Sequence, residues 1–270
     1  MCPRRADRAI RRVRAGTDTA GMTGVGMRLI DLTLPLEDGM PYHRLHSPFR
    51  ILPGPLQHRP TSKWMGTNDR FGRVSFLNEQ MVMPGHAGTH IDAPLHGDPD
   101  GSDIASTGLS SMVGPASCID LRRWRGPRVV VSLGQLRNAV GDAPIHPIVL
   151  LHTGWSELLT SDPRNYYDNS MGLSGDAALW LREAGATCVG IDAPSVDPPD
   201  AVGAPAHMEF LRGKPPICII ENLVNLGQLP SSVPLLVAAP VPVVGASGSP
   251  ARVFAVFNDD VPDGRRPDVA

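Results

Sequence analysis

Three histidines and one aspartate lie close together in residues 84–97, PGHAGTHIDAPLHG: His86, His90, Asp92 and His96. The chain has 9 His in 270 residues, so three within so short a stretch is a marked enrichment. Imidazole nitrogens and carboxylate oxygens are ligands of divalent ions such as Zn²⁺ and Mn²⁺. A lone His is more often a surface or capping residue, but a group of this composition favours a metal site.

The spacing of these residues places a condition on the backbone. Glycines and Pro94 exclude a regular helix, so the segment is strand or loop. All four side chains occupy even positions and share one face of an extended chain. A straight strand would separate His86 from His90 by roughly 13 Å, too far to share an ion about 2.1 Å from each nitrogen. We therefore expect a bend at Gly88, whereas His90 and Asp92 converge without one.

The same residues resemble a known family. The pattern H-x-G-T-H-x-D-x-P-x-H in residues 86–96 resembles, without a gap, the signature of the metal-dependent cyclase family, which includes bacterial kynurenine formamidases and isatin hydrolases. Three later segments resemble further parts of that family: 189–197 (VGIDAPSVD), 206–211 (AHMEFL) and 219–226 (IIENLVNL). Residues 234–257, which contain GSPAR, resemble its closing strands. The resemblance covers about residues 27–257.

The resemblance implies roles for individual residues. The implied metal ligands are the first two histidines and the aspartate of the signature, joined by a later His and Glu where a second ion is present: His86, His90, Asp92, His207 and Glu221. The last histidine of the signature, His96, is implied to shuttle protons. Asp192 and Asp197 are expected to shape loops rather than bind metal. We expect one or two ions per subunit, either Zn²⁺ or Mn²⁺, because a site without thiolate does not select zinc strongly.

The composition indicates which elements position these residues. With 28 Gly, 28 Pro and 5% aromatic residues, the chain favours short strands and shaped loops over a helical bundle. Strands are expected at 28–33, 73–83, 129–132, 148–153, 188–192, 217–221, 235–244 and 252–257. Helices are expected at 133–140, 175–184 and 206–212. This order predicts a mixed α/β fold, and the resemblance implies a swivelling β/β/α domain with a mixed sheet.

The chain is expected to form one domain, residues 27–257, with a tail at each end. Residues 1–26 hold six Arg and no apolar periodicity, and residues 258–270 are polar, so both are expected to be disordered or loose. Residues 36–72 hold five Pro and form an insertion, a lid or an oligomer arm, in which Trp64 and Met65 argue against disorder. Short formamidases lack such an insertion, so the chain resembles the longer, isatin-hydrolase-like branch.

Several classes of protein are disfavoured. No apolar run approaches the roughly 18 residues of a membrane helix. Basic residues cluster in the tail, whereas a nucleic-acid binder carries them on its folded part. The four cysteines are widely spaced, which favours free thiols and a cytoplasmic location. The resemblance implies a homodimer or homotetramer.

These observations lead to one main functional hypothesis. A metal-activated water, with His96 as proton shuttle, would hydrolyse a small aromatic or cyclic amide: a formamide, lactam or imide. Trp64, Met65 and Trp155 offer apolar surface for its ring. The sequence contains no G-x-S-x-G, so a serine-hydrolase route has no support. The alternatives are a cyclase or dehydratase of a biosynthetic intermediate, and a non-catalytic metal- or ligand-binding module, against which His96 speaks.

Overall fold

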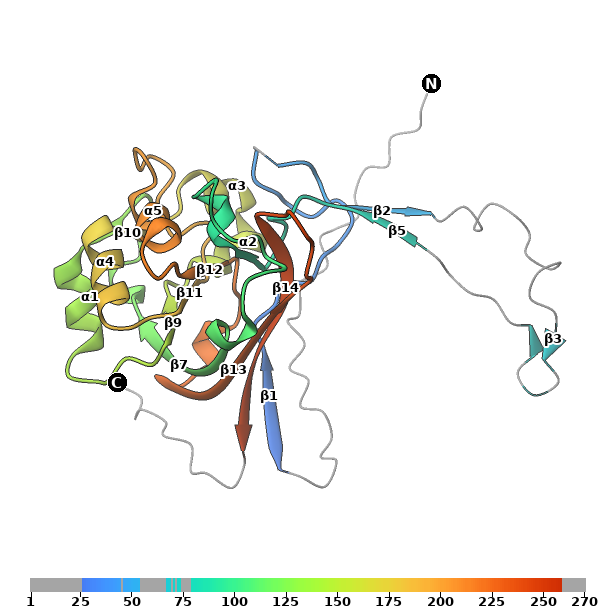
Figure 1. The fold of residues 1–270 in the computed structure, drawn as a ribbon. Helices are drawn as coiled ribbons and strands as arrows, with labels where there is room; N and C mark the ends of the chain where they lie inside the picture. Colours follow the sequence, from blue (N-terminus) through green and yellow to red (C-terminus); the bar gives the residue numbers. More distant parts are fainter. Residues whose placement is uncertain are drawn as a thin grey trace. The chain divides into compact units, whose positions relative to one another are not determined.

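The computed structural model describes residues 26–44, 46–53, 67–68, 70, 72–73 and 79–258 (Figure 1). They divide into a larger unit, residues 26–35 and 85–258, and a smaller unit within residues 36–84. The larger unit contains every residue for which the sequence suggests a role in metal binding or catalysis. Trp64 and Met65 lie outside the described residues, as do Cys2, His58 and most of the two expected tails.

A mixed sheet forms the centre of the larger unit. Its order is β1 (Met27–Asp31), β14 (Gly248–Asn258), β13 (Ser232–Pro240), β7 (Val113–Asp120), β9 (Ile148–His152), β11 (Cys188–Ile191), β12 (Cys218–Glu221) and β6 (His90–Asp92). Strands β7, β9, β11 and β12 run parallel to one another. Strand β6 pairs with both β12 and β14, so the sheet closes on itself and β1 adds to the outside of β14. This closure brings residues near 90, 221 and 248 together.

Three helices lie together on one side of the parallel strands (Figure 1). Helix α1 (Leu133–Val140) begins with a capping box of Ser132 and Gln135, and α4 (Gly175–Glu183) begins at Ser174, which accepts from Ala177 N. Helix α5 (Pro205–Arg212) begins with proline, whose missing N–H costs nothing at that position. These three helices confirm the sequence-based predictions to within one residue at each end.

The core fills the inside of the closed sheet and the layer beneath the helices. Strand β9 is buried along its whole length, as expected for a parallel strand with both faces covered. Cys118, Cys188 and Cys218 are buried and are not joined in disulfides, as expected for these three cysteines. Trp155 is 2% exposed and donates from Nε1 to Tyr166 O, so it belongs to this core.

The remaining elements are short. In the larger unit, β8 (Val130–Val131) pairs with β10 (Gly172–Leu173), and α2 (Leu158–Ser161) and α3 (Pro163–Asp168) follow β9. In the smaller unit, β2 (Arg50–Pro53) pairs with β5 (Glu79–Val82), and β3 (Thr67–Asn68) pairs with β4 (Gly72–Arg73). No helix among the described residues is long and apolar enough to cross a membrane.

The predicted strands differ from the observed strands in several places. Strands β2, β3 and β10 were not predicted, and within the described residues the strand predicted at 73–83 is present only at Arg73 and in β5. Strand β7, Val113–Asp120, was not predicted, because Gly114 and Pro115 interrupt its start. The strand predicted at 235–244 spans Ser232–Pro240 instead, and Val244 beyond it is exposed. The sequence-based prediction of a mixed α/β fold is confirmed.

Candidate metal centre

Strand β6 supplies two of the polar side chains at the closure of the sheet. His90 lies opposite Glu221 of β12, and Asp92 lies opposite Gly248 of β14. Gly88 has φ +58°, a left-handed conformation that turns the chain between His86 and His90. The predicted bend at Gly88 is therefore present.

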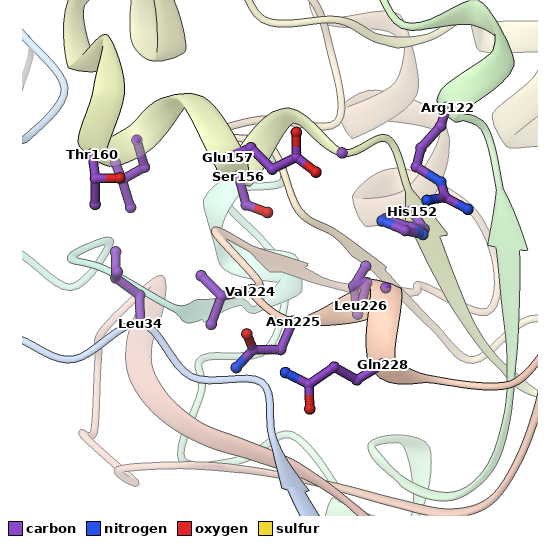
Figure 2. A pocket seen from close by; sticks show the side chains of 13 residues that line it. Leu34, Arg122, His152, Ser156, Glu157, Thr160, Val224, Asn225, Leu226 and Gln228 are labelled. Atoms are coloured by element: carbon purple, nitrogen blue, oxygen red, sulfur yellow. The ribbon is translucent and has the colours of Figure 1, made fainter. Parts of the chain in front are cut away.

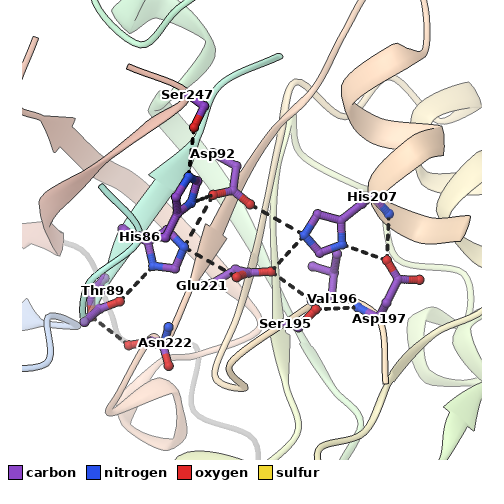
Figure 3. Close-up of polar contacts among 12 residues, drawn as sticks. His86, Thr89, Asp92, Ser195, Val196, Asp197, His207, Glu221, Asn222 and Ser247 are labelled. Atoms are coloured by element: carbon purple, nitrogen blue, oxygen red, sulfur yellow. Dashed lines mark hydrogen bonds and ion pairs between the residues drawn. The ribbon is translucent and has the colours of Figure 1, made fainter. Parts of the chain in front are cut away.

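Two histidines and two carboxylates face one another at this point (Figure 3). His90 Nε2 lies 3.4 Å from both Asp92 Oδ1 and Glu221 Oε2. His207 Nε2, on α5, lies 3.3 Å from Glu221 Oε1 and 3.6 Å from Asp92 Oδ2. His90 Nε2 and Asp92 Oδ2 are buried without a hydrogen-bond partner within the described part of the chain. Buried polar atoms almost always have partners, so these two fit the ligand atoms of a bound cation.

The second nitrogen of each ring has its own partner. His90 Nδ1 donates to Gly88 O at 2.8 Å, and His207 Nδ1 donates to Asp197 Oδ2 at 2.7 Å. His86 lies with Nδ1 2.6 Å from Asp92 Oδ1 and Nε2 3.0 Å from Ser247 Oγ. Such outer partners orient ligand rings in metal sites. For His90 and His207, they leave Nε2 facing the carboxylates.

His96 lies at the more open side of the cluster. Its side chain is exposed, and its ring centroid is 4.2 Å from that of His86 and 5.9 Å from that of His207. Ligand atoms of His86, Asp92 and His96 lie within 4.8 Å of one another, as do those of His90, Asp92 and Glu221. Asp92 thus belongs to both groups, while the position of His96 suits either metal binding or proton transfer.

The charged groups of the cluster change the pKa values of His90 and Asp92. Burial disfavours the imidazolium of His90, but the nearby carboxylates of Asp92 and Glu221 outweigh this effect and raise the pKa of His90 to about 10. Burial would raise the pKa of Asp92, yet His207, His86 and His90 hold it well below its usual value. Without a cation, the imidazole of His90 therefore holds a proton that a divalent ion would displace.

The surroundings of His96 within the cluster change its pKa. Although the side chain is solvent-exposed, partial desolvation lowers the pKa of His96 despite the attraction of Asp92. Its imidazole is therefore suited to accept a proton near neutral pH.

The aspartates near β11 have structural partners. Asp192 is fully buried and accepts from Thr153 N and Gly154 N, which fixes the turn after β9. Asp197 caps α5 by accepting from Ala206 N and His207 N. Both shape loops, and Asp197 also orients a ring of the cluster.

Sequence reasoning missed the residues that support His86. Ser247 contacts the ring, and a Cβ at Gly248 would lie 2.6 Å from His86 Cε1, so only glycine fits there. The GSPAR segment contains that glycine, but only the β6–β14 pairing shows what it contacts.

A cavity of about 340 Å³ lies elsewhere in the larger unit (Figure 2). Its lining includes His152, Arg122 and Glu157 and contains none of the six candidate site residues. Arg122 pairs with Asp120 and Glu157 pairs with Arg125, so these charges are compensated.

Comparison with known proteins decides the family. The Cyclase family model matches residues 30–198. The chain belongs to this family. A kynurenine formamidase of Geobacillus thermodenitrificans is 31% identical over 212 residues, 77% of this chain and 92% of the relative. A kynurenine formamidase of Salinibacter ruber is 36% identical over 198 residues, 73% of this chain and 87% of the relative.

Solved structures of other proteins share the cyclase-family fold. Isatin hydrolase A from Labrenzia aggregata has a TM-score of 0.71 at 23% identity, covering 87% of this chain and 95% of that one. A protein described as a predicted metal-dependent hydrolase, from Bacillus stearothermophilus, has a TM-score of 0.64 at 26% identity, covering 85% and 98%. The family and fold class indicated by the sequence are both confirmed.

Proposed function

We propose that this cyclase-family chain is a metal-dependent amidohydrolase that cleaves C–N bonds other than peptide bonds, in a small aromatic or cyclic amide. One observation carries the proposal: within the described part of the chain, His90 Nε2 and Asp92 Oδ2 are buried without hydrogen-bond partners, among ligand types suited to a divalent ion. The curated relatives named kynurenine formamidase support the substrate class.

The proposed ligands are His86, His90 and Asp92, with His207 and Glu221 completing a second position if two ions bind. Asp92 suits the shared role because its Oδ1 lies 2.6 Å from His86 Nδ1 and 3.4 Å from His90 Nε2, while its Oδ2 lies 3.6 Å from His207 Nε2. The identity proposed for the ion is Zn²⁺ or Mn²⁺. Burial raises the pKa of Cys218 to about 12, so this nearby thiol stays protonated and adds no soft ligand that would favour zinc.

The chain's own residues have distinct tasks in the proposed hydrolysis. When bound, a divalent ion supplies Lewis acidity that polarises a carbonyl and lowers the pKa of water to about 7. His90 and Asp92 are nearly fully buried, whereas the His86 side chain is 15% exposed and His96 is exposed. Substrate and water therefore approach from the side of His86 and His96. There, His96 accepts a proton from water and returns it to the departing nitrogen.

We propose that residues 36–72, which lie in the smaller unit, are a lid or an oligomer arm. Four apolar side chains of the described strands of the smaller unit are exposed: Ile51, Leu52, Met81 and Val82. An isolated two-stranded ribbon is marginally stable in water. These exposed apolar side chains could therefore pack against a substrate or a second subunit. We propose a cytoplasmic homodimer or homotetramer that acts on a small molecule and binds neither nucleic acid nor membrane. Analytical ultracentrifugation tests the assembly, and a monomer would contradict it.

A hydrolysis screen tests the activity. The metal-loaded protein is incubated with an N-formyl arylamine, an isatin-like lactam, a cyclic imide and, as a control, a phosphodiester. We expect turnover of at least one amide, its loss in chelator and its return with Zn²⁺ or Mn²⁺. Cleavage of the phosphodiester alone would overturn the proposal. The name of the matched family supports one alternative, a cyclase or dehydratase, which failure on every substrate would favour.

A further inference from the structure

Asp197 gathers three N–H donors at the start of α5. Its Oδ1 accepts from Ala206 N at 2.9 Å, and its Oδ2 accepts from His207 N at 2.9 Å and from His207 Nδ1 at 2.7 Å. The side chain is 5% exposed. The Asp197 carboxylate thus caps α5 and also accepts a hydrogen bond from the imidazole of His207 (Figure 3).

This contact determines which nitrogen of His207 faces the cluster. An ionised carboxylate only accepts hydrogen bonds, so Nδ1 of His207 must carry a proton. Nε2 is then directed toward Glu221 Oε1 and Asp92 Oδ2. A neutral imidazole held in this way presents the lone pair of Nε2, the electron pair that a metal ion requires.

The same loop also holds the other candidate ligand of the second position. Val196 N donates to Glu221 Oε1 at 3.1 Å. Two consecutive residues of one loop therefore set the positions of His207 on α5 and Glu221 on β12.

The fold fixes this loop independently of any ligand. Leu173 N of β10 donates to Val196 O at 2.8 Å. A Cβ at Gly172 would lie 2.4 Å from Val196 O and 2.7 Å from Asp197 C, so the loop packs directly on the glycine backbone. The loop therefore has no room to shift toward β10, and Asp197 is held in place by backbone contacts.

We propose that Asp197 is a positioning residue that makes His207 competent to bind metal, in addition to capping α5. The inference rests on the proposed metal centre and assigns a task to a residue outside its ligand set. An amide in place of the carboxylate has one acceptor oxygen for three donors, so it cannot hold the cap and the ring equally.

The test separates the two tasks of Asp197. Affinity for Zn²⁺ and for Mn²⁺ is measured by competition with a chromophoric chelator, and stability by melting temperature, for Asp197→Asn and Asp197→Ala. Asp162→Asn and Asp162→Ala are matched controls, because Asp162 caps α3 by accepting from Asn165 N and holds no imidazole within the described residues. Steady-state kinetics on the best amide substrate complete the comparison.

We expect Asp197→Asn to lower metal affinity about 10- to 100-fold, with a fall in kcat rather than a rise in KM. Asp197→Ala should add a lower melting temperature, and the Asp162 variants should change stability alone. Wild-type affinity in Asp197→Asn would overturn the inference, even if Asp197→Ala were unstable, because Asp197 would then be only a cap. If the wild-type protein binds metal but hydrolyses no amide, the proposed activity is wrong. The metal affinities of the Asp197 and Asp162 variants would still test the role of Asp197.

Discussion

His90 and Glu221 lie directly opposite each other on β6 and β12, with His90 Nε2 3.4 Å from Glu221 Oε2. They are separated by 131 residues in the sequence, and the closure of the sheet brings them together. Neither side chain is more than 7% exposed. Burying an imidazole and a carboxylate is costly without close partners, so this arrangement supports a buried, charged centre.

Asp92→Asn should remove most of the bound metal. The substitution keeps the shape of the side chain but removes the negative charge that offsets the ion, and Asp92 belongs to both candidate ligand groups. Elemental analysis of the purified variant measures the loss. Asp120→Asn, which changes an exposed aspartate paired with Arg122, is the control and should keep its metal. Equal metal in wild type and Asp92→Asn would refute the ligand assignment.

His96→Ala should keep the metal and lose roughly 10² to 10⁴ in kcat, the usual effect of removing a general acid–base. Its exposed position beside His86 is the reason for separating it from the buried ligands. His146→Ala is the control, because His146 contacts Ser232 Oγ away from the cluster. If metal content falls in step with activity, His96 is a ligand instead.

Metal affinity should rise with pH. The pKa of His90 is about 10 in the metal-free protein, so at pH 7 this ring carries a proton that metal must displace. One displaced proton corresponds to about a tenfold gain in apparent affinity per pH unit. Titration with Mn²⁺ between pH 6 and 8, in buffers of different ionisation enthalpy, measures both affinity and proton release. An affinity independent of pH, with no released proton, would contradict the coupling.

The same pKa gives the sign of a stability effect. Because folding raises the pKa of His90, its contribution to the stability of the metal-free protein is complete below about pH 6.5 and is lost as the pH rises toward 10. This contribution should be absent from the metal-loaded protein, in which the ring is neutral.

Gly248→Ala should disturb the cluster through His86. The added methyl group would lie 2.6 Å from His86 Cε1 and 2.8 Å from Ile91 O, and both distances are shorter than van der Waals contact. We expect a loss of about 1–3 kcal/mol in stability and a lower metal affinity. Gly134→Ala on α1 is the control, because no atom of the described residues outside its chain neighbours and the helix's own backbone lies within 4 Å of the added Cβ; this variant should be neutral or slightly stabilising. Wild-type metal affinity and melting temperature in Gly248→Ala would disprove the contact.

Features that depend on residues close together in the chain could be predicted from the sequence. Helix starts at Ser132 and Ser174 depend on side chains within three residues, so their patterns are readable directly. The bend at Gly88 followed from the reach of a metal ion, and it is present. Each of these features is determined by neighbours along the chain.

Contacts between residues far apart in the chain could not be predicted from the sequence. Gly114 and Pro115 lie near the start of strand β7, and the pairing of β7 with β13 shifts register between Val233 and Leu236, so local propensity gave no signal. The support of His86 by Ser247 depends on the pairing of β6 with β14. No spacing along the chain encodes such a contact.

Anomalous diffraction from crystals loaded with Zn²⁺ or Mn²⁺ can show whether His90 and Asp92 belong to a metal centre. We expect an anomalous peak where β6 closes the sheet, about 2.0–2.2 Å from His90 Nε2 and from an Asp92 oxygen. Crystals soaked with either ion that show no anomalous peak at this position would refute the metal centre.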